Sequence, residues 1–154
     1  MRVLFFLGLL ACIFLSCKKG KVSTAPTITF TTLTPNNWLY TDYSTEGPIL
    51  NFHIKDKEGD IGYNFDNKSY SNIYVINEAD TFPFQFPSMS ITNDNNMDLD
   101  VSLNISKVIL NSLRPNTDAF PPRTDTVQFR FYVKDFAGNV SDTIETGNFY
   151  YIIP

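Results

Sequence analysis

FHIKDKEGDI at residues 52–61 and FYVKDFAGNV at residues 131–140 share one pattern, F-x-[IV]-K-D-x-x-G-[DN]-[IV]. The alternation of apolar and polar residues before the Asp is typical of a strand with one buried face. Asp at the start of a turn and Gly three residues later are typical of a type I turn, because Gly readily adopts positive φ. Each copy therefore predicts a strand that runs into a tight acidic turn.

The rest of the chain reads as further short strands separated by turns. The predicted strands cover residues 27–33, 49–55, 72–77, 81–86, 97–105, 126–134 and 140–153, the last with an irregularity at Gly147. Pro83 and Pro87 place residues 81–86 at a sheet edge, because proline cannot donate to a ladder. Residues 107–113 fit either a helical turn or a strand, and residues 38–43 fit either an edge strand or an aromatic loop. Residues 62–71, 92–96 and 119–124 read as loops. With 14 Phe and 8 Tyr, the chain is predicted to be an all-β sandwich of seven or eight strands.

The N-terminus reads as a targeting segment. Arg2 precedes an apolar run at residues 3–15, which is shorter than the about 20 residues that a bilayer span needs and suits a secretory signal. Residues 14–17, FLSC, resemble a bacterial lipobox, although Phe14 stands where Leu is usual. The resemblance implies a signal peptide at 1–16, a lipidated Cys17, and a tether at 17–26 before a domain at 27–154. An ordinary cleaved signal with an incidental Cys is the alternative.

Lipidation would fix the protein at a membrane. The resemblance to bacterial lipoproteins implies three acyl chains, palmitate among them, and two are enough for stable anchoring. The other cysteine, Cys12, would leave with the signal, so the mature chain would have no disulfide, no thiol nucleophile and no Cys-based metal site. The expected location is the cell envelope, at the outer membrane, with the periplasmic face favoured over the cell surface because the Lys18-Lys19 tether lacks an acidic cluster.

The charge of the chain argues against a nucleic-acid partner. The net charge is −4, and removal of the four basic residues before position 22 leaves eight basic against sixteen acidic side chains. A phosphate-binding face requires clustered Lys and Arg. The single His53 and the absence of a free Cys leave no zinc site and no nucleophilic triad. We therefore expect no enzymatic activity.

Residues 127–141 resemble the penultimate strand and final hairpin of fibronectin type III and related immunoglobulin-like domains. The tyrosine usual near the start of that strand is replaced by Phe129, which removes its hydroxyl. The resemblance implies an immunoglobulin-like sandwich and no particular activity. The segment DKEGDIG at 56–62, after a signal of this type, also resembles lipoproteins of the Bacteroidetes.

In such a sandwich the two acidic turns would emerge at the same end. Carboxylate, amide and carbonyl oxygens are the ligands that calcium takes, which makes a calcium site one interpretation of the two turns. Its candidate ligands are Asp56, Glu58, Asp60, Asp135, Asn139 and Asp142. The other interpretation is structural: each Asp bonds to its own backbone, each Gly supplies positive φ, and the other acids are solvated.

The aromatic residues Trp38, Tyr40 and Tyr43 form the second candidate binding site. They could stack on a sugar, or Trp38 could pack over a sheet edge while the tyrosines border the core. The sequence thus predicts a non-catalytic, membrane-anchored binding or structural module with an unknown protein partner. The alternative is a carbohydrate-binding lipoprotein of an outer-membrane glycan-uptake system.

Overall fold

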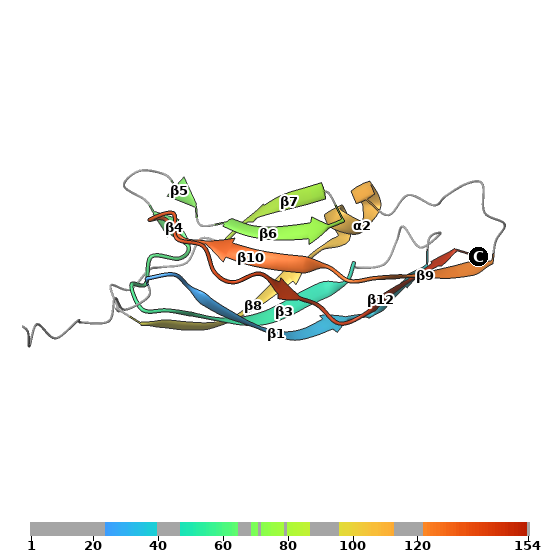
Figure 1. Ribbon diagram of the computed structural model, residues 1–154, viewed down its shortest axis with the longest axis horizontal. Coiled ribbons are helices and arrows are strands. Elements are labelled where there is room, and N and C mark those ends of the chain that lie inside the picture. The colour runs from blue at the N-terminus through green and yellow to red at the C-terminus, as the bar shows by residue number, and fades with distance from the viewer. Residues whose placement is uncertain are drawn as a thin grey trace, which may run out of the picture.

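The computed structural model describes residues 24–39, 47–64, 69, 70, 72–78, 80–86, 96–112 and 122–153. This part of the chain is almost entirely β-structure, as the sequence predicts, in two facing sheets with a core between them (Figure 1). One sheet has the strand order β1-β3-β8, with β1 at Thr27–Thr34, β3 at Ile49–Asp56 and β8 at Met97–Asn104. The other has the order β11-β10-β6-β7, with β11 at Ile144–Glu145, β10 at Arg130–Lys134, β6 at Asn72–Asn77 and β7 at Asp80–Gln85.

A third sheet extends the molecule at one end. Its order is β2-β12-β9, with β2 at Asn37–Leu39, β12 at Phe149–Ile153 and β9 at Arg123–Val127. The strand β2 runs parallel to β12, and β9 runs antiparallel to it. A short ribbon pairs β4, Tyr63–Asn64, with β5, Ser69–Tyr70. The loops predicted at 62–71 and 119–124 were therefore wrong in part, because paired residues lie within both.

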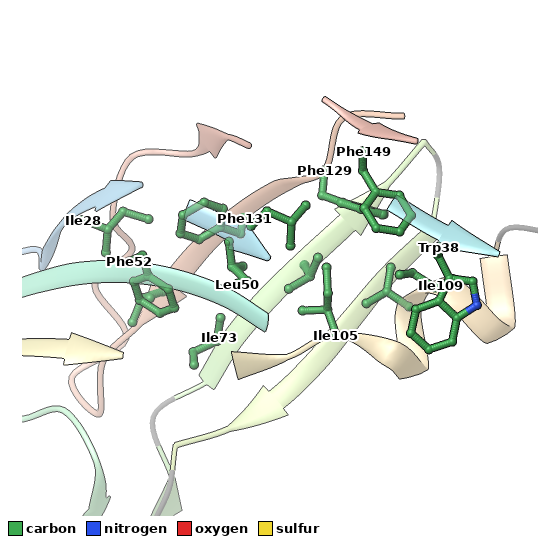
Figure 2. Packing of buried hydrophobic residues seen from close by; sticks show 14 of the residues in the cluster. Ile28, Trp38, Leu50, Phe52, Ile73, Ile105, Ile109, Phe129, Phe131 and Phe149 are labelled. Atoms are coloured by element: carbon green, nitrogen blue, oxygen red, sulfur yellow. The ribbon is translucent and has the colours of Figure 1, made fainter. Parts of the chain in front are cut away.

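Alternating burial on β3 confirms the predicted inward face. Leu50, Phe52 and Ile54 are buried, while the residues between them are half-buried. The ring of Phe52 lies 5.1 Å from that of Phe131 on the opposite sheet, measured between centroids. Figure 2 shows both rings in the apolar cluster that fills the space between the sheets. This contact joins the two segments of the repeated pattern through the core.

The strand β1 changes its inward face halfway along. Ile28 and Leu33 are both buried although they differ in parity. The pairing with β3 shifts register between Phe30 and Thr32, which is a β-bulge. The bulge rotates the second half of β1 and turns Thr32 outward.

The prediction of a single strand at residues 126–134 was wrong, because this segment is not continuous. It divides at residues 128–129 into β9 and β10, because β9 pairs with β12 whereas β10 pairs with β6 and β11. Phe129 stays buried at this break. Its N–H donates to the hydroxyl of Thr146 at 3.0 Å, and its carbonyl accepts from the N–H of Thr146 at 2.8 Å. Thr146 thus supplies the partners that a continuous ladder would have provided. The single last strand predicted at 140–153 was also wrong: in place of an irregularity at Gly147, the chain leaves the sheet of β11 and enters that of β12.

Residues 106–112 form a helix, which resolves the ambiguity at 107–113. The helix α2, Ser106–Ser112, begins where the side chain of Asn104 accepts the N–H of Ser106 at 2.9 Å. Val108 and Ile109 are buried in the core cluster. Among the described residues, no helix is long and apolar enough to cross a membrane.

The two copies of the repeated pattern end at the same pole. The strands β3 and β10 lie in facing sheets and run in the same direction (Figure 1). The backbone N–H of Phe136 donates to the carbonyl of Asp60 at 3.2 Å, so the turns after the two strands are in contact. We call residues 56–62 and 135–139 the twin-turn end.

Candidate functional site

Both turns are closed by the same two devices. The carboxylate of Asp56 accepts the N–H of Asp60 at 3.0 Å, and that of Asp135 accepts the N–H of Asn139 at 2.7 Å. Gly59 and Gly138 both have positive φ, 69° and 90°. The leading Asp of each copy therefore bonds to the amide four residues later, across a glycine that permits the reversal.

These two aspartates are buried, so their carboxylates depend on hydrogen bonds from the protein in place of water. Asp56 is 2% exposed and Asp135 is 4% exposed. Asp56 also accepts the N–H of Glu58 at 3.2 Å, and Asp135 also accepts the side-chain amide of Asn139 at 2.8 Å. Buried carboxylates are tolerated when such donors satisfy their oxygens. The structural interpretation of the two turns is therefore the one that these hydrogen bonds support.

Asp60 joins one turn to the other. Besides its carbonyl bond to Phe136, its carboxylate accepts the N–H of Ala137 at 3.2 Å. The equivalent residue of the second copy, Asn139, donates its amide to the leading aspartate. Asp60 has no side-chain amide to donate and instead places a carboxyl group against the carboxylate of Asp56. The first copy thus brings two carboxyl groups together at the position where the second copy pairs a carboxylate with an amide.

This arrangement raises the pKa of Asp60 from 3.8 to about 6. The largest cause is removal of the group from water, followed by its hydrogen bond with Asp56 and the negative charges of Asp135 and Asp56. The bond from Ala137 opposes the shift. The carboxyl group therefore exchanges its proton in a mildly acidic range rather than near pH 4.

The six candidate calcium ligands do not form one cluster. The structure brings Asp56, Asp60, Asp135 and Asn139 together, whereas Glu58 and Asp142 are exposed. Asp142 instead borders a small hollow of about 120 Å³ beside Ala25 and Pro26. Within the described ranges, no group of three or more His, Cys, Asp or Glu side chains is arranged to hold a metal ion. The carboxylate oxygens of Asp56 and Asp135 accept hydrogen bonds from amide groups of their own turns.

The aromatic candidates are separated by burial. Trp38, on β2, is 6% exposed and belongs to the core cluster (Figure 2). Its ring faces the interior and offers no platform to a sugar. Tyr40 and Tyr43 lie outside the described residues, as does Cys17.

The outer face of the first sheet carries an ion-pair cluster that the sequence pattern did not reveal. His53 on β3 has Nε2 2.7 Å from Asp98 Oδ1 and Nδ1 2.9 Å from Asp100 Oδ1, both on β8. Lys55 lies 2.9 Å from the other oxygen of Asp98 and holds the pKa of that carboxyl below its usual value. The register that places His53 opposite Asp100 and Lys55 opposite Asp98 makes these contacts possible. The cluster is a cross-strand surface network.

A stacked tyrosine pair occupies the outer face of the second sheet. Tyr74 on β6 and Tyr132 on β10 are direct partners across the strands, with ring centroids 4.8 Å apart and an interplanar angle of 12°. Burial, followed by the charge of Tyr74, raises the pKa of Tyr132. Each ring of the pair covers one face of the other.

A larger hollow lies where β1 ends and β12 begins. Its volume is about 560 Å³, and it is lined by Phe30, Thr32, Leu33, Thr34, Pro35, Asn36, Gly147, Asn148 and Tyr150. The register shift within β1 and the break between β11 and β12 both border it. The predicted irregularity at Gly147 was the one sequence signal that pointed to this place.

Comparison with known proteins adds no relative. No family model matches the chain, and no curated protein or solved structure matches it either.

Proposed function

We propose that the protein is a lipid-anchored, non-catalytic binding module of the cell envelope, built as an immunoglobulin-like sandwich and held at the outer membrane by Cys17. The strand order supports the immunoglobulin-like assignment. The strand β1 lies beside β3 in one of the facing sheets, and the segment after it, β2, joins the last strand, β12, in parallel in the third sheet. The orders β1-β3-β8 and β11-β10-β6-β7 correspond to the A-B-E and G-F-C-C′ orders of immunoglobulin-like sandwiches.

The observation that carries the proposal is which end of the domain the N-terminal segment enters. Thr27, near the first described residue, pairs with Lys55 immediately before the first acidic turn. Ala25 and Pro26 lie beside Val140 and Asp142, just after the second turn. The chain between Cys17 and the domain is therefore joined to the twin-turn end.

An anchor at the twin-turn end would leave the opposite end free. Thr34, at the other terminus of β1, pairs with Ile49, and the sheet β2-β12-β9 extends beyond it (Figure 1). The carboxylates of the twin-turn end are engaged by backbone amides, which supports a structural role for that end. We place the partner-binding surface at the end formed by β2, β9 and β12, with Pro35, Asn36, Gly147 and Asn148 beside them, and call it the distal end.

Two exposed apolar residues provide a matched test of this orientation. Leu39 lies on the distal sheet and is 39% exposed, whereas Val140 lies beside the twin-turn end and is 47% exposed. A photo-crosslinking amino acid would replace each in turn in the full-length protein in bacterial cells. We expect discrete adducts from position 39 and none from position 140. Adducts from position 140 alone, or none from either position, would overturn the proposal.

The anchor itself is tested by Cys17→Ala. The variant should lose incorporation of an alkyne-labelled fatty acid and should leave the membrane fraction. Retention of both properties would refute lipidation at Cys17, and a Cys12→Ala variant that behaves as the unaltered protein serves as the control.

A further inference from the structure

We propose that the hollow at the distal end binds a neutral saccharide. This inference rests on the proposed function, and it names a ligand class and a site for it. The site differs from the aromatic residues that the sequence suggested, since Trp38 is buried. It consists of the surface around the end of β1, the start of β12 and the Gly147 break.

The shape of the hollow suits a small or linear ligand. Its volume of about 560 Å³ lies within the range of roughly 300–1,000 Å³ typical of ligand sites. It opens to solvent along the surface between β1 and β12 rather than enclosing a cavity. An open hollow of this kind can accept a short saccharide or one part of a longer one.

The lining offers an aromatic surface for the apolar faces of a sugar ring. Along β12, Phe149 and Tyr151 are buried while Tyr150 is 37% exposed, so the ring of Tyr150 is on the outward face. Phe30, which is half-buried, lines the hollow from β1. The negatively polarised face of an aromatic ring attracts the C–H groups that a pyranose presents on its flat side.

The polar part of the lining matches the hydroxyl groups of a sugar. Asn36 and Asn148 supply amides that both donate and accept, and Thr32 and Thr34 supply hydroxyl groups; all four residues are exposed. Of the described residues that line the hollow, none carries a charge. This is notable in a chain with sixteen acidic side chains. An ionic ligand would find no counter-charge here, whereas a neutral polyol would find a donor and acceptor set.

The walls are held in place before any ligand arrives. The N–H of Tyr150 donates to the carbonyl of Asn36 at 2.8 Å, which ties the two sides together. The next residue, Asn37, is the parallel partner of Tyr150 in the pairing of β2 with β12. The hydroxyl of Thr32 accepts from the amide of Asn51 at 3.1 Å. Preformed walls reduce the ordering cost of binding.

Gly147 provides a way to close the hollow without straining the backbone. A Cβ placed on Gly147 would meet nothing within 4 Å, and its φ is not in the positive region. Gly147→Trp should therefore fold normally and fill the hollow. Gly147→Ala adds a single methyl group at the same position and is its matched control.

The experiment is calorimetric titration of the full-length lipoprotein, in detergent micelles, with neutral hexasaccharides. The probes are the cello-, xylo-, manno-, malto- and chito-oligosaccharides, up to about 5 mM, which is enough to detect a dissociation constant of about 1 mM. We expect at least one to bind. Gly147→Trp should weaken its binding at least tenfold relative to Gly147→Ala, which adds only one methyl group at the same position. Tyr150→Ala should also weaken it about tenfold through loss of the stacking surface.

The failures of the two proposals are distinguishable. If no hexasaccharide binds, or if Gly147→Trp binds as tightly as Gly147→Ala, the saccharide site is refuted. The crosslinks from position 39 and the effect of Cys17→Ala would be unaffected by that result. Conversely, the Cys17→Ala variant could stay in the membrane fraction while the protein still binds a saccharide. That result would refute lipidation at Cys17 and leave the saccharide site standing. Peptide binding in the hollow that a hexasaccharide does not displace would also overturn the inference.

Discussion

The side chain of Asp60 accepts a hydrogen bond from the backbone amide of Ala137 at 3.2 Å, across 77 residues of sequence. The bond joins the acidic turn of one sheet to the matching turn of the facing sheet. It exists because β3 and β10 run in the same direction and deliver their turns to one end of the core (Figure 1). The similar sequences of the two turns thus make similar local bonds, and a single carboxylate links them.

Stability should depend on pH through Asp60. Its pKa in the folded protein is about 6, above the ordinary value of 3.8. The folded state therefore holds this proton more tightly than the unfolded chain. The resulting stabilisation is complete below pH 3.8 and is lost as the pH rises through 6. After allowance for partial exposure of the group, we expect a contribution of about 1 kcal/mol.

Asp60→Asn tests this contribution directly. The amide can donate to Asp56 as Asn139 donates to Asp135. We expect the variant to be more stable than the unaltered protein by about 1 kcal/mol at neutral pH, with the gain shrinking towards pH 4. Urea unfolding at several pH values measures it, with the exposed Asp142→Asn as control. A variant that is less stable at neutral pH would contradict the raised pKa.

Asp135→Ala should destabilise the domain. The substitution removes the buried acceptor of both the backbone and the side-chain amide of Asn139, in a partly buried turn. A lost partner for buried donors costs about 1–3 kcal/mol. The free energy of unfolding is the measurement, and Asp142→Ala, an exposed carboxylate beyond the same turn, should change it by less than about 0.5 kcal/mol. Equal effects of the two substitutions would count against the hydrogen-bonded turn.

Two glycines should respond oppositely to alanine. At Gly47 a Cβ would lie 2.5 Å from the Cβ of Ser106 and would collide with its hydroxyl, at the start of α2. We expect Gly47→Ala to cost about 1–3 kcal/mol through this overpacking. Gly147→Ala, which meets open space, should be neutral or slightly stabilising. Thermal melts of the two variants make the comparison, and a neutral Gly47→Ala would show that the helix start can shift at no cost.

The single tryptophan should report a buried environment. Trp38 is 6% exposed, so we expect blue-shifted emission in the native protein and weak quenching by acrylamide. Trp38→Ala should cost about 3–5 kcal/mol, as for large core residues. The adjacent and exposed Leu39→Ala should change stability by less than about 0.5 kcal/mol. Strong acrylamide quenching of the native protein would be inconsistent with a core position for Trp38.

The sequence could predict the strands and their inward faces because alternation is a local property. Leu50, Phe52 and Ile54 alternate with polar residues, and each is buried as that pattern requires. It could also predict that the two acidic turns meet, once facing sheets were assumed. It did not predict the break at residues 128–129, because the apolar pattern continues through the break and the change of pairing partner depends on distant strands.

The candidate sites were harder to predict from the sequence, because the burial of a side chain and the register of two strands depend on residues far away along the chain. Trp38, with exposed residues on either side of it, could face solvent or core, and its pairing with Tyr151 on β12 turned it inward. His53 met Asp98 and Asp100 through the register of β3 with β8. The hollow around Tyr150 arose from a bulge in one strand and a break in another, more than a hundred residues later.

The sequence by itself determined a strand-rich chain with two similarly built acidic turns, because side-chain alternation and turn chemistry act within a few residues of the backbone. Only the tertiary structure decided what the acids do and where a ligand fits. Whether a carboxylate binds an amide or a cation, and whether an aromatic ring is core or surface, depends on which strands become neighbours. That choice is made by the packing of two sheets around one apolar core.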